Sequence, residues 1–227
     1  MLAAMETARI AELLEPFLSG EPLSPSLAAQ LQAYLELLLR WNARINLTAV
    51  RDPEQIVTRH FGESLFAARV LRDAGALASE VGAAPTLADV GSGAGFPGIP
   101  IKLFAPELQL TLIESQNKKA TFLREVVRTL AIEGAEVYCG RADTWSSTAA
   151  IVTMRAVEKF EDVLPVVASL VAEAGTLCLL IGASQTRSAQ AVLGRHWQPG
   201  TVNPIPDSVG RVVIMGKLTT KRDLLWS

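Results

Sequence analysis

Residues 87–101 read Leu87-Ala88-Asp89-Val90-Gly91-Ser92-Gly93-Ala94-Gly95-Phe96-Pro97-Gly98-Ile99-Pro100-Ile101. An apolar run leads into this segment, and Gly93, Gly95 and Gly98 satisfy the pattern G-x-G-x-x-G. Glycine adopts positive φ angles and lets a ligand approach the backbone closely. A turn that leaves a strand and opens a helix also offers unpaired backbone amides. The segment therefore predicts a ligand-binding turn between a strand and a helix.

Three interpretations of this turn remain open at this point. G-x-G-x-x-G alone is typical of a nicotinamide dehydrogenase. Asp89 lies two residues before Gly91, and the resulting Asp-x-Gly-x-Gly-x-Gly resembles motif I of S-adenosylmethionine-dependent methyltransferases. Glu114, at the end of the next expected strand, can accept both ribose hydroxyls, which either cofactor requires. The third interpretation is a purely structural turn.

Strand and helix patterns alternate around the glycine-rich turn. We expect strands at 86–90, 110–113, 135–139, 151–154 and 176–181, a closing strand at 211–217, and helices at 118–130 and 161–172. This alternation predicts an α/β fold with a mostly parallel sheet covered by helices on both faces. Ligands of such sheets bind at the carboxyl ends of the strands, where the strand order reverses.

The first third of the chain is predicted to be helical. Ser24-Pro25 and Asp52-Pro53 are helix starts, because the first residue caps free amides and proline suits the first helical position. Around Gly75 and Gly82 the residues are mostly small, and the two glycines make the backbone flexible. We therefore expect an N-terminal helical extension at 1–75, packed on a catalytic domain at 76–227.

Composition excludes several classes of protein. The 227 residues are 49% hydrophobic and 19% charged with a net charge of −2, which disfavours a disordered chain or a generally basic nucleic-acid binder. Two cysteines and two histidines, without metal-ligand spacing, argue against a disulfide scaffold or a metal centre. Without an apolar stretch of spanning length, and with Glu6 preceding any signal-peptide core, we expect a cytoplasmic protein with no membrane partner.

Further motifs resemble the bacterial small-subunit rRNA methyltransferase G family, also called glucose-inhibited division protein B. The run Trp41-Asn42-Ala43-Arg44-Ile45-Asn46-Leu47-Thr48 resembles its signature W-N-x-x-x-N-L-T. The glycine-rich turn resembles its loop, including the ending Phe96-Pro97-Gly98-Ile99-Pro100, and Glu114-Ser115 and Arg155-Ala156 also align. The sequence departs from many members at Glu63, Ile181 and Val212.

The resemblance implies a Rossmann-like class I methyltransferase sheet with S-adenosyl-L-methionine as cofactor. It implies methylation of guanine N7 in 16S rRNA, at guanosine 527 of the 530 loop in the usual rRNA numbering. The partner would be 16S rRNA or the small ribosomal subunit, and the enzyme a monomer. Together with the glycine motif, it implies a cofactor site at Asp89, Gly91, Gly93, Phe96, Glu114, Ser115, Gln116, Ala142, Asp143 and Arg155.

The chemistry of guanine N7 suits this sequence. N7 carries a lone pair and no proton, so its methylation needs no general base, and alignment of the reactants is the main contribution. Arg155, at the end of the fourth expected strand, is the catalytic candidate. Its guanidinium can pair with the methionine carboxylate or with an rRNA phosphate. A structural salt bridge is the alternative.

Positive charge gathers beside the predicted cofactor domain. Residues 40–72 contain six arginines against three acidic residues, and Lys118, Lys119, Arg124 and Arg128 form a second basic stripe. We expect RNA contacts from Arg44, Arg51, Arg59, His60, Lys118 and Lys119. A solvated helix face is the alternative for such a charge run. Two other functions stay open: a non-catalytic rRNA-binding assembly factor and an NAD-dependent oxidoreductase.

Overall fold

The computed structural model describes residues 5–78, 84–157 and 159–218. Gly82, one of the two expected boundary glycines, lies outside these ranges. The described strands form a single seven-stranded sheet in the order β3-β2-β1-β4-β5-β7-β6. Their bounds are β1 Thr86–Val90, β2 Gln109–Glu114, β3 Ala135–Cys139, β4 Ala149–Arg155, β5 Val171–Gly182, β6 Trp197–Pro204 and β7 Arg211–Leu218.

The sheet is mostly parallel, as predicted. Strands β1 to β5 pair in parallel, whereas β7 pairs antiparallel with both β5 and β6. The strand expected at 211–217 is confirmed as β7, the last in the chain, but the edge of the sheet beyond it is formed by β6. Strand β6 was not predicted. Most of its side chains are exposed, and Pro199 and Gly200 weaken the apolar pattern of a strand.

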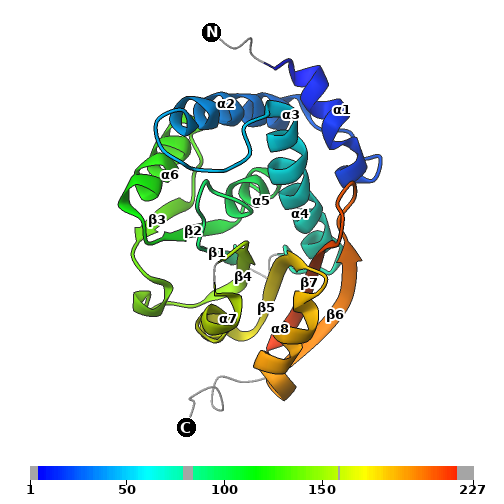
Figure 1. Cartoon of the computed structure of the whole chain (residues 1–227), viewed down its shortest axis with the longest axis vertical. Coiled ribbons are helices and arrows are strands. Elements are labelled where there is room, and N and C mark those ends of the chain that lie inside the picture. The colour runs from blue at the N-terminus through cyan, green and yellow to red at the C-terminus, as the bar shows by residue number, and fades with distance from the viewer. Residues whose placement is uncertain (1–4, 79–83, 158, 219–227) are drawn as a thin grey trace.

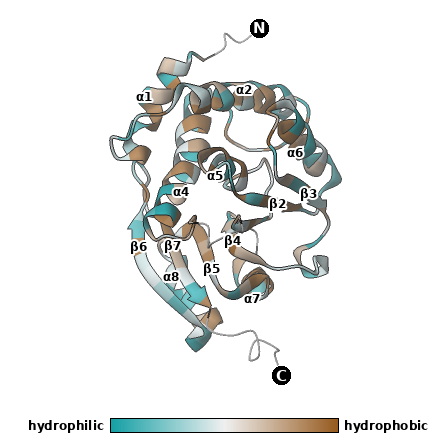
Figure 2. Cartoon of the chain, turned by 180° about the vertical axis from the view of Figure 1, so that it is seen from behind, coloured by the Kyte–Doolittle hydropathy of each residue, from teal (hydrophilic) through white to brown (hydrophobic). Residues whose placement is uncertain are grey.

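Helices cover both faces of the sheet (Figure 1). The α-helices are α1 Thr7–Leu18, α2 Pro25–Asn42, α3 Pro53–Ile56, α4 Glu63–Asp73, α5 Gly98–Phe104, α6 Asn117–Thr129, α7 Phe160–Ser169 and α8 Gln185–Leu193. One buried cluster joins α1, α2, α4, α5 and α6 to one face of the sheet, and a second joins α7 and α8 to the other. Figure 2 shows brown, hydrophobic residues on the central strands and paler or teal residues along β6.

The predicted helix starts are confirmed by their caps. The Ser24 hydroxyl accepts from the Leu27 amide at 3.2 Å, and the Asp52 carboxylate accepts from the Gln55 amide at 2.8 Å. The second start opens α3, which continues through a π-helical turn at Val57–Gly62 into α4. Single π-helical turns inside helices occur frequently at functional sites. This one carries two of the predicted RNA contacts.

The predicted helix at 161–172 extends too far at its C-terminal end. Helix α7 stops at Ser169, and β5 begins at Val171, which pairs with Ala149 of β4. The apolar residues continue across this junction, so the sequence does not show where the helix ends. Only the pairing of Val171 with β4 marks the change from helix to strand. Of the described helices, none is both long and apolar enough to cross a membrane.

Candidate cofactor and substrate site

The predicted site residues gather where the strand order reverses. Strand β1 pairs with β2 on one side and β4 on the other, so the chain runs outward in both directions from β1. The glycine-rich turn follows β1, Glu114 ends β2 and Arg155 ends β4. The three features therefore meet at the carboxyl edge of the sheet, which is the usual ligand position in such folds.

Two glycines of the turn occupy positions that other residues do not fit. Gly91 has a φ of +70°, and a Cβ there would lie 3.1 Å from the Cγ2 of Val157. Gly95 has a φ of +91°, and a Cβ there would overlap the Tyr34 hydroxyl and the Ile99 side chain. Positive φ is costly for residues with a Cβ. The shape of the turn therefore depends on glycine at both positions.

Asp89 lies beneath the turn rather than on its open side. Its side chain is fully buried, and its carboxylate accepts from the Gly98 amide at 3.2 Å and from the Thr153 hydroxyl at 2.8 Å. Burial raises the pKa of Asp89 to about 6, against the opposing hydrogen bonds from Thr153 and Gly98. The structure therefore places Asp89 to hold the turn against β4 and the start of α5.

Glu114 closes the turn from the neighbouring strand. One carboxylate oxygen accepts from the Gly93 amide at 2.9 Å, and the other accepts from the Gln116 amide at 2.7 Å. The side chain is 5% exposed, while Ser115 and Gln116 beside it are exposed. Each carboxylate oxygen has a second lone pair, so Glu114 retains acceptor capacity in a fixed orientation.

A pocket of about 410 Å³, here called the Ala142 pocket, opens beside these residues. Its lining includes residues at or just after the ends of β1, β2, β3 and β4: Val90, Gly91, Ile113, Ser115, Gly140, Arg141, Ala142, Asp143 and Val157. Arg141 forms an ion pair with Asp143 at 2.7 Å and lowers the pKa of that carboxyl. Asp143 is half-exposed there, so the pair is accessible from solvent.

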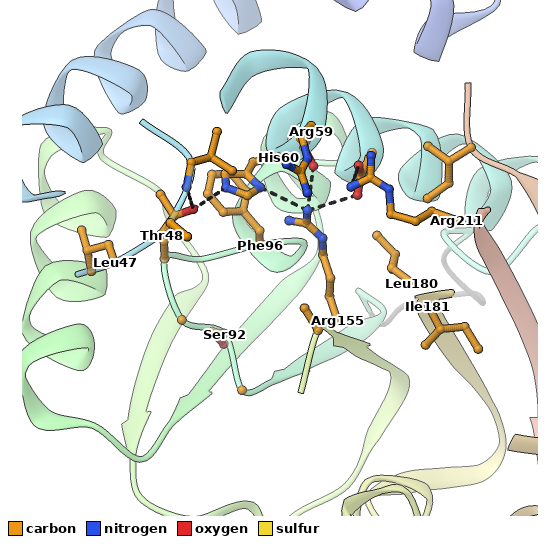
Figure 3. A pocket seen from close by; sticks show the side chains of 18 of the residues that line it. Leu47, Thr48, Arg59, His60, Ser92, Phe96, Arg155, Leu180, Ile181 and Arg211 are labelled. Atoms are coloured by element: carbon orange, nitrogen blue, oxygen red, sulfur yellow. Dashed lines mark hydrogen bonds and ion pairs between the residues drawn. The ribbon is translucent and has the colours of Figure 1, made fainter. Parts of the chain in front are cut away.

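A second pocket of about 490 Å³, here called the arginine pocket, lies on the other side of the turn. It is walled by the π-helical turn, the loop before it and the ends of β4 and β5, with Arg59, Arg155 and Arg211 in its lining (Figure 3). Gly91 lines both pockets. Of the predicted cofactor residues, Gly93, Phe96 and Arg155 line the arginine pocket and Ser115, Ala142 and Asp143 line the Ala142 pocket, whereas Asp89, Glu114 and Gln116 line neither.

Arg155 is the centre of a polar cluster in the arginine pocket. Its Nη2 lies 2.7 Å from the Arg59 carbonyl oxygen, 3.1 Å from His60 Nδ1 and 3.1 Å from Glu63 Oε2. Glu63 Oε1 lies 2.6 Å from Arg211 Nη1. Burial raises the pKa of Glu63, against the two arginines, and lowers the pKa of Arg155. The structural salt bridge considered for Arg155 is thus present, yet these contacts occupy only Nη2.

Two predicted residues lie deeper than expected. Phe96 is 6% exposed, and its ring stacks on Tyr34 at a centroid distance of 5.4 Å and on His60 at 4.9 Å. Its ring therefore belongs largely to the aromatic core. His60 was predicted as an RNA contact, but it is buried and forms the wall of the arginine pocket. We correct its expected place from the basic surface to the pocket.

The remaining predicted RNA residues fall into two environments. Arg44 follows α2, and Lys118 and Lys119 open α6; the Trp41 and Phe122 rings, 5.6 Å apart, join these two helices. Arg44 and Lys118 are exposed, and neither they nor Lys119 form an ion pair within the described part of the chain. The two basic runs therefore meet near the arginine pocket, which Lys119 lines.

Of the other two predicted RNA contacts, Arg59 is free to reach a ligand, whereas Arg51 is engaged within the protein. The Arg59 side chain is exposed at the edge of the arginine pocket. Arg51 donates to the Asn42 carbonyl and to the Asn46 side chain, both at 2.7 Å, and so braces the loop after α2. Farther along α4, Arg72 pairs with Glu21 at 2.6 Å, so the charge of 40–72 does not all face the site.

Sequence reasoning missed three residues of the pocket wall: Thr48, Glu63 and Arg211. Thr48 stands at the end of the quoted W-N-x-x-x-N-L-T signature, which is the signal for it. Glu63 and Arg211 lie far apart in sequence, and only the antiparallel position of β7 brings Arg211 to Glu63. No local pattern in the chain predicts that pairing.

Comparisons with known proteins identify the family of the chain. The family model for rRNA small subunit methyltransferase G matches residues 27–197. A ribosomal RNA small subunit methyltransferase G of Xanthomonas campestris pv. campestris is 39% identical over 190 residues, covering 83% of this chain and 84% of the relative. The protein of that name from Xylella fastidiosa is 40% identical over 197 residues, covering 86% and 84%.

Solved structures give the same fold at lower identity. A SAM-dependent methyltransferase from Aquifex aeolicus aligns with a TM-score of 0.55 at 15% identity, covering 74% of this chain and 94% of its own. A ribosomal protein L11 methylase from Lactobacillus delbrueckii subsp. bulgaricus aligns with a TM-score of 0.55 at 16% identity, covering 70% and 80%. The predicted Rossmann-like methyltransferase fold is confirmed. The chain belongs to the rRNA small subunit methyltransferase G family.

Proposed function

We propose that this enzyme transfers a methyl group from S-adenosylmethionine to N7 of a guanine in 16S rRNA, at guanosine 527 of the 530 loop. The methyltransferase class and the cofactor come with the family. The choice of N7 rests on one observation. Of the ionisable groups that line the arginine pocket, Glu63 is paired with two arginines, both ring nitrogens of His60 are hydrogen-bonded, and the others are cations, so none is arranged to remove a proton.

The residues present fit the cofactor. Glu114, held by two backbone amides, has lone pairs for the ribose hydroxyls, and the Ala142 pocket offers a backbone amide and Asp143 for adenine. Gly91 lines both pockets, and a Cβ there would crowd Val157 beside the Ala142 pocket. Nη1 of Arg155 faces no recorded partner among the described residues and suits the methionine carboxylate.

Guanine N7 needs positioning more than proton transfer. When bound, S-adenosylmethionine supplies a methyl group activated by its sulfonium charge. The N7 lone pair forms the new bond directly, so no proton leaves the base. The chain's task is to hold the base in line and to exclude water, for which Leu47, Leu180 and Ile181 provide apolar walls. Glu63 is bound by Arg155 and Arg211, so it fixes the arginines rather than acting as a base.

The surface around the arginine pocket suits an RNA backbone. Arg44 and Lys118 are exposed, Arg59 and Lys119 line the pocket itself, and none of the four forms an ion pair among the described residues. Cations without competing carboxylates bind phosphates and release counterions. We therefore place the rRNA across the junction of α2, α6 and the π-helical turn.

The finer organisation follows the same proposal. Residues 1–75 act as a substrate-recognition extension on a methyltransferase domain at 76–227. The enzyme works as a monomer in the cytoplasm, on 16S rRNA or on the small ribosomal subunit. The role of the extension is supported by two contacts. Tyr34 donates to the glycine-rich turn, and the Arg59 carbonyl accepts from Arg155.

A transfer assay tests the proposed reaction. Purified protein is incubated with labelled S-adenosylmethionine and small subunits whose rRNA lacks N7-methylguanosine, and the nucleosides are then separated by mass spectrometry. We expect the label in N7-methylguanosine. Label in another nucleoside contradicts the choice of N7. RNA binding without any transfer identifies a non-catalytic assembly factor instead.

A further inference from the structure

A chain of hydrogen bonds runs through the wall of the arginine pocket and ends on a hydroxyl group (Figure 3). Arg155 Nη2 lies 3.1 Å from His60 Nδ1, and His60 Nε2 lies 2.8 Å from Thr48 Oγ1. A guanidinium group donates hydrogen bonds and accepts none. His60 Nδ1 therefore accepts from Arg155, which fixes the tautomer of the ring.

The tautomer determines the direction of the next hydrogen bond. Burial, followed by the charge of Arg155, lowers the pKa of His60 to about 3, so the ring is neutral and carries its proton on Nε2. Nε2 therefore donates to the Thr48 hydroxyl oxygen. The backbone amide of Val50 donates to the same oxygen at 3.1 Å.

Thr48 is left with one hydrogen to donate. A hydroxyl group has two lone pairs and one hydrogen, and both lone pairs are engaged by His60 and Val50. Within the ranges that the structure describes, no acceptor is recorded for the remaining hydrogen. Thr48 lines the arginine pocket. The wall thus presents a neutral hydrogen-bond donor that is open to an acceptor on a bound molecule.

The loop that carries Thr48 is braced on all sides. The Asn42 side chain is buried and accepts from the amides of Leu47 at 2.9 Å and Thr48 at 3.1 Å, and its amino group donates to the Thr48 carbonyl at 3.1 Å. Arg51 ties the same loop together through Asn46 at 2.7 Å. The polar residues of the signature segment therefore hold one hydroxyl in place.

We propose that the Thr48 hydroxyl donates to O6 of the target guanine and thereby selects guanine over adenine. This inference rests on the proposed function. On the edge that carries N7, guanine presents O6 as an acceptor, whereas adenine presents an amino donor. A donor on the protein therefore attracts guanine and opposes adenine. Thr48 and Arg155 lie at opposite ends of this series of hydrogen bonds. The neutral Thr48 hydroxyl can therefore meet O6 of the guanine, while the Arg155 cation remains for the methionine carboxylate of the cofactor.

The experiment pairs a change in the protein with a change in the base. Small subunits are reconstituted with 16S rRNA that carries either guanosine or 2-aminopurine riboside at the methylated position. The 2-aminopurine base keeps N7 and lacks O6. Thr48→Val removes the hydroxyl at nearly constant volume, and Thr48→Ser keeps it as a matched control. Initial rates of N7 methylation are measured for each combination.

The proposal predicts a specific pattern of kcat/KM. Wild type loses about 10- to 100-fold on 2-aminopurine, which is the usual cost of leaving a buried hydrogen-bond donor without its acceptor. Thr48→Val loses a similar factor on guanosine and loses little more on 2-aminopurine, while Thr48→Ser stays close to wild type. If Thr48→Val on 2-aminopurine shows the product of the two separate losses, the hydroxyl and O6 act independently and the proposal is overturned. Equal wild-type rates on both bases overturn it without any variant.

Separate readouts distinguish the other outcomes. Calorimetry with S-adenosylhomocysteine should give Thr48→Val the wild-type affinity; a loss matching the loss of activity places the hydroxyl on the cofactor and contradicts the guanine contact. Thermal unfolding followed by circular dichroism reports whether Thr48→Val folds. If it does not, the wild-type comparison of the two bases decides. Absence of wild-type N7 methylation on guanosine would instead refute the proposed function.

Discussion

The hydroxyl of Tyr34 in α2 donates to the backbone carbonyl of Ala94 in the glycine-rich turn. Tyr34 is fully buried, and its ring contacts Phe61 of the π-helical turn and Phe96 of the glycine-rich turn. One side chain from the N-terminal helices therefore supports both the π-helical turn and the glycine-rich turn. The extension and the sheet are linked here by a hydrogen bond as well as by apolar packing.

Tyr34→Phe tests that link. Loss of the hydroxyl leaves the Ala94 carbonyl without its recorded partner in a buried place, which costs about 1–3 kcal/mol of the free energy of unfolding. Urea unfolding of both proteins measures the difference. Tyr138→Phe serves as a control, because the Tyr138 hydroxyl contacts Thr144 in an exposed place. An equal loss of unfolding free energy in both variants would show that the hydrogen bond to Ala94 stabilises the fold no more than an exposed one.

Gly91→Val should abolish cofactor binding while the protein stays folded. A valine there takes a positive φ, at a cost of about 1–3 kcal/mol, and crowds Val157 where the two pockets meet. Calorimetry with S-adenosylhomocysteine measures the loss. Gly194→Val is the matched control, since Gly194 has a φ of +54° and open space around its Cβ position. Unchanged affinity in Gly91→Val would show that the cofactor does not approach the backbone at Gly91.

Glu114→Ala should weaken cofactor binding by about 1.5–3 kcal/mol, the usual range for hydrogen bonds to a charged group. The variant also frees the amides of Gly93 and Gln116, so the turn loses its closure from β2. Glu114→Gln retains one acceptor oxygen and should lose less. The same calorimetric titration applies, and a change of only a few tenths of a kcal/mol would mean that Glu114 does not hold the ribose.

The buried state of His60 makes stability depend on pH. Its pKa is about 3 in the folded protein against 6.5 for the free side chain. Between these values the unfolded chain binds more protons, so the free energy of unfolding decreases as the pH falls, by at most about 1.4 kcal/mol per pH unit. Urea unfolding at several pH values should show a shallower dependence for His60→Gln. Identical slopes would mean that His60 titrates normally.

Reversal of Arg44 and Arg59 to Glu should weaken rRNA binding and reduce its salt dependence. Each lost phosphate contact lowers the slope of log K against log salt by about 0.7–0.9. Cofactor affinity should change less than rRNA affinity, because only Arg59 of the two lines the pocket that holds Arg155. Binding titrations at several salt concentrations measure the slope.

The control for that experiment is Arg187→Glu with Arg195→Glu. It makes the same change in net charge on and beside α8, on the opposite face of the sheet. If the Arg44/Arg59 reversal leaves methylation and its salt slope intact, the RNA surface lies elsewhere, and the basic stripe Lys118–Arg128 becomes the next candidate.

Local signals made most of the fold predictable. The helix starts at Ser24 and Asp52 carry their own caps, and β1 and β3 have the predicted bounds because apolar runs end there at glycine or polar turns. The edge strand β6 and the end of α7 were missed or misplaced. Both depend on pairing with distant strands, which local periodicity does not report.

The candidate site was predictable to a similar degree. Asp89 and Gly91 stand in a motif whose spacing follows from the turn itself, and Glu114 was found at the end of the next expected strand. The Glu63–Arg211 ion pair was not predictable, because it joins α4 to the start of β7 across most of the chain. The buried position of His60 was also missed, since a histidine among arginines is typical of a basic surface and only its stacking on Phe96 places it inside.

Mapping of N7-methylguanosine in 16S rRNA from cells with and without this protein tests the central claim most directly. Borohydride reduction and aniline treatment cleave RNA at that nucleoside, and primer extension locates the break. We predict one break in the 530 loop, at guanosine 527, that disappears when the protein is removed and returns when it is restored. A break that persists without the protein, or an unmodified loop in its presence, would contradict the account.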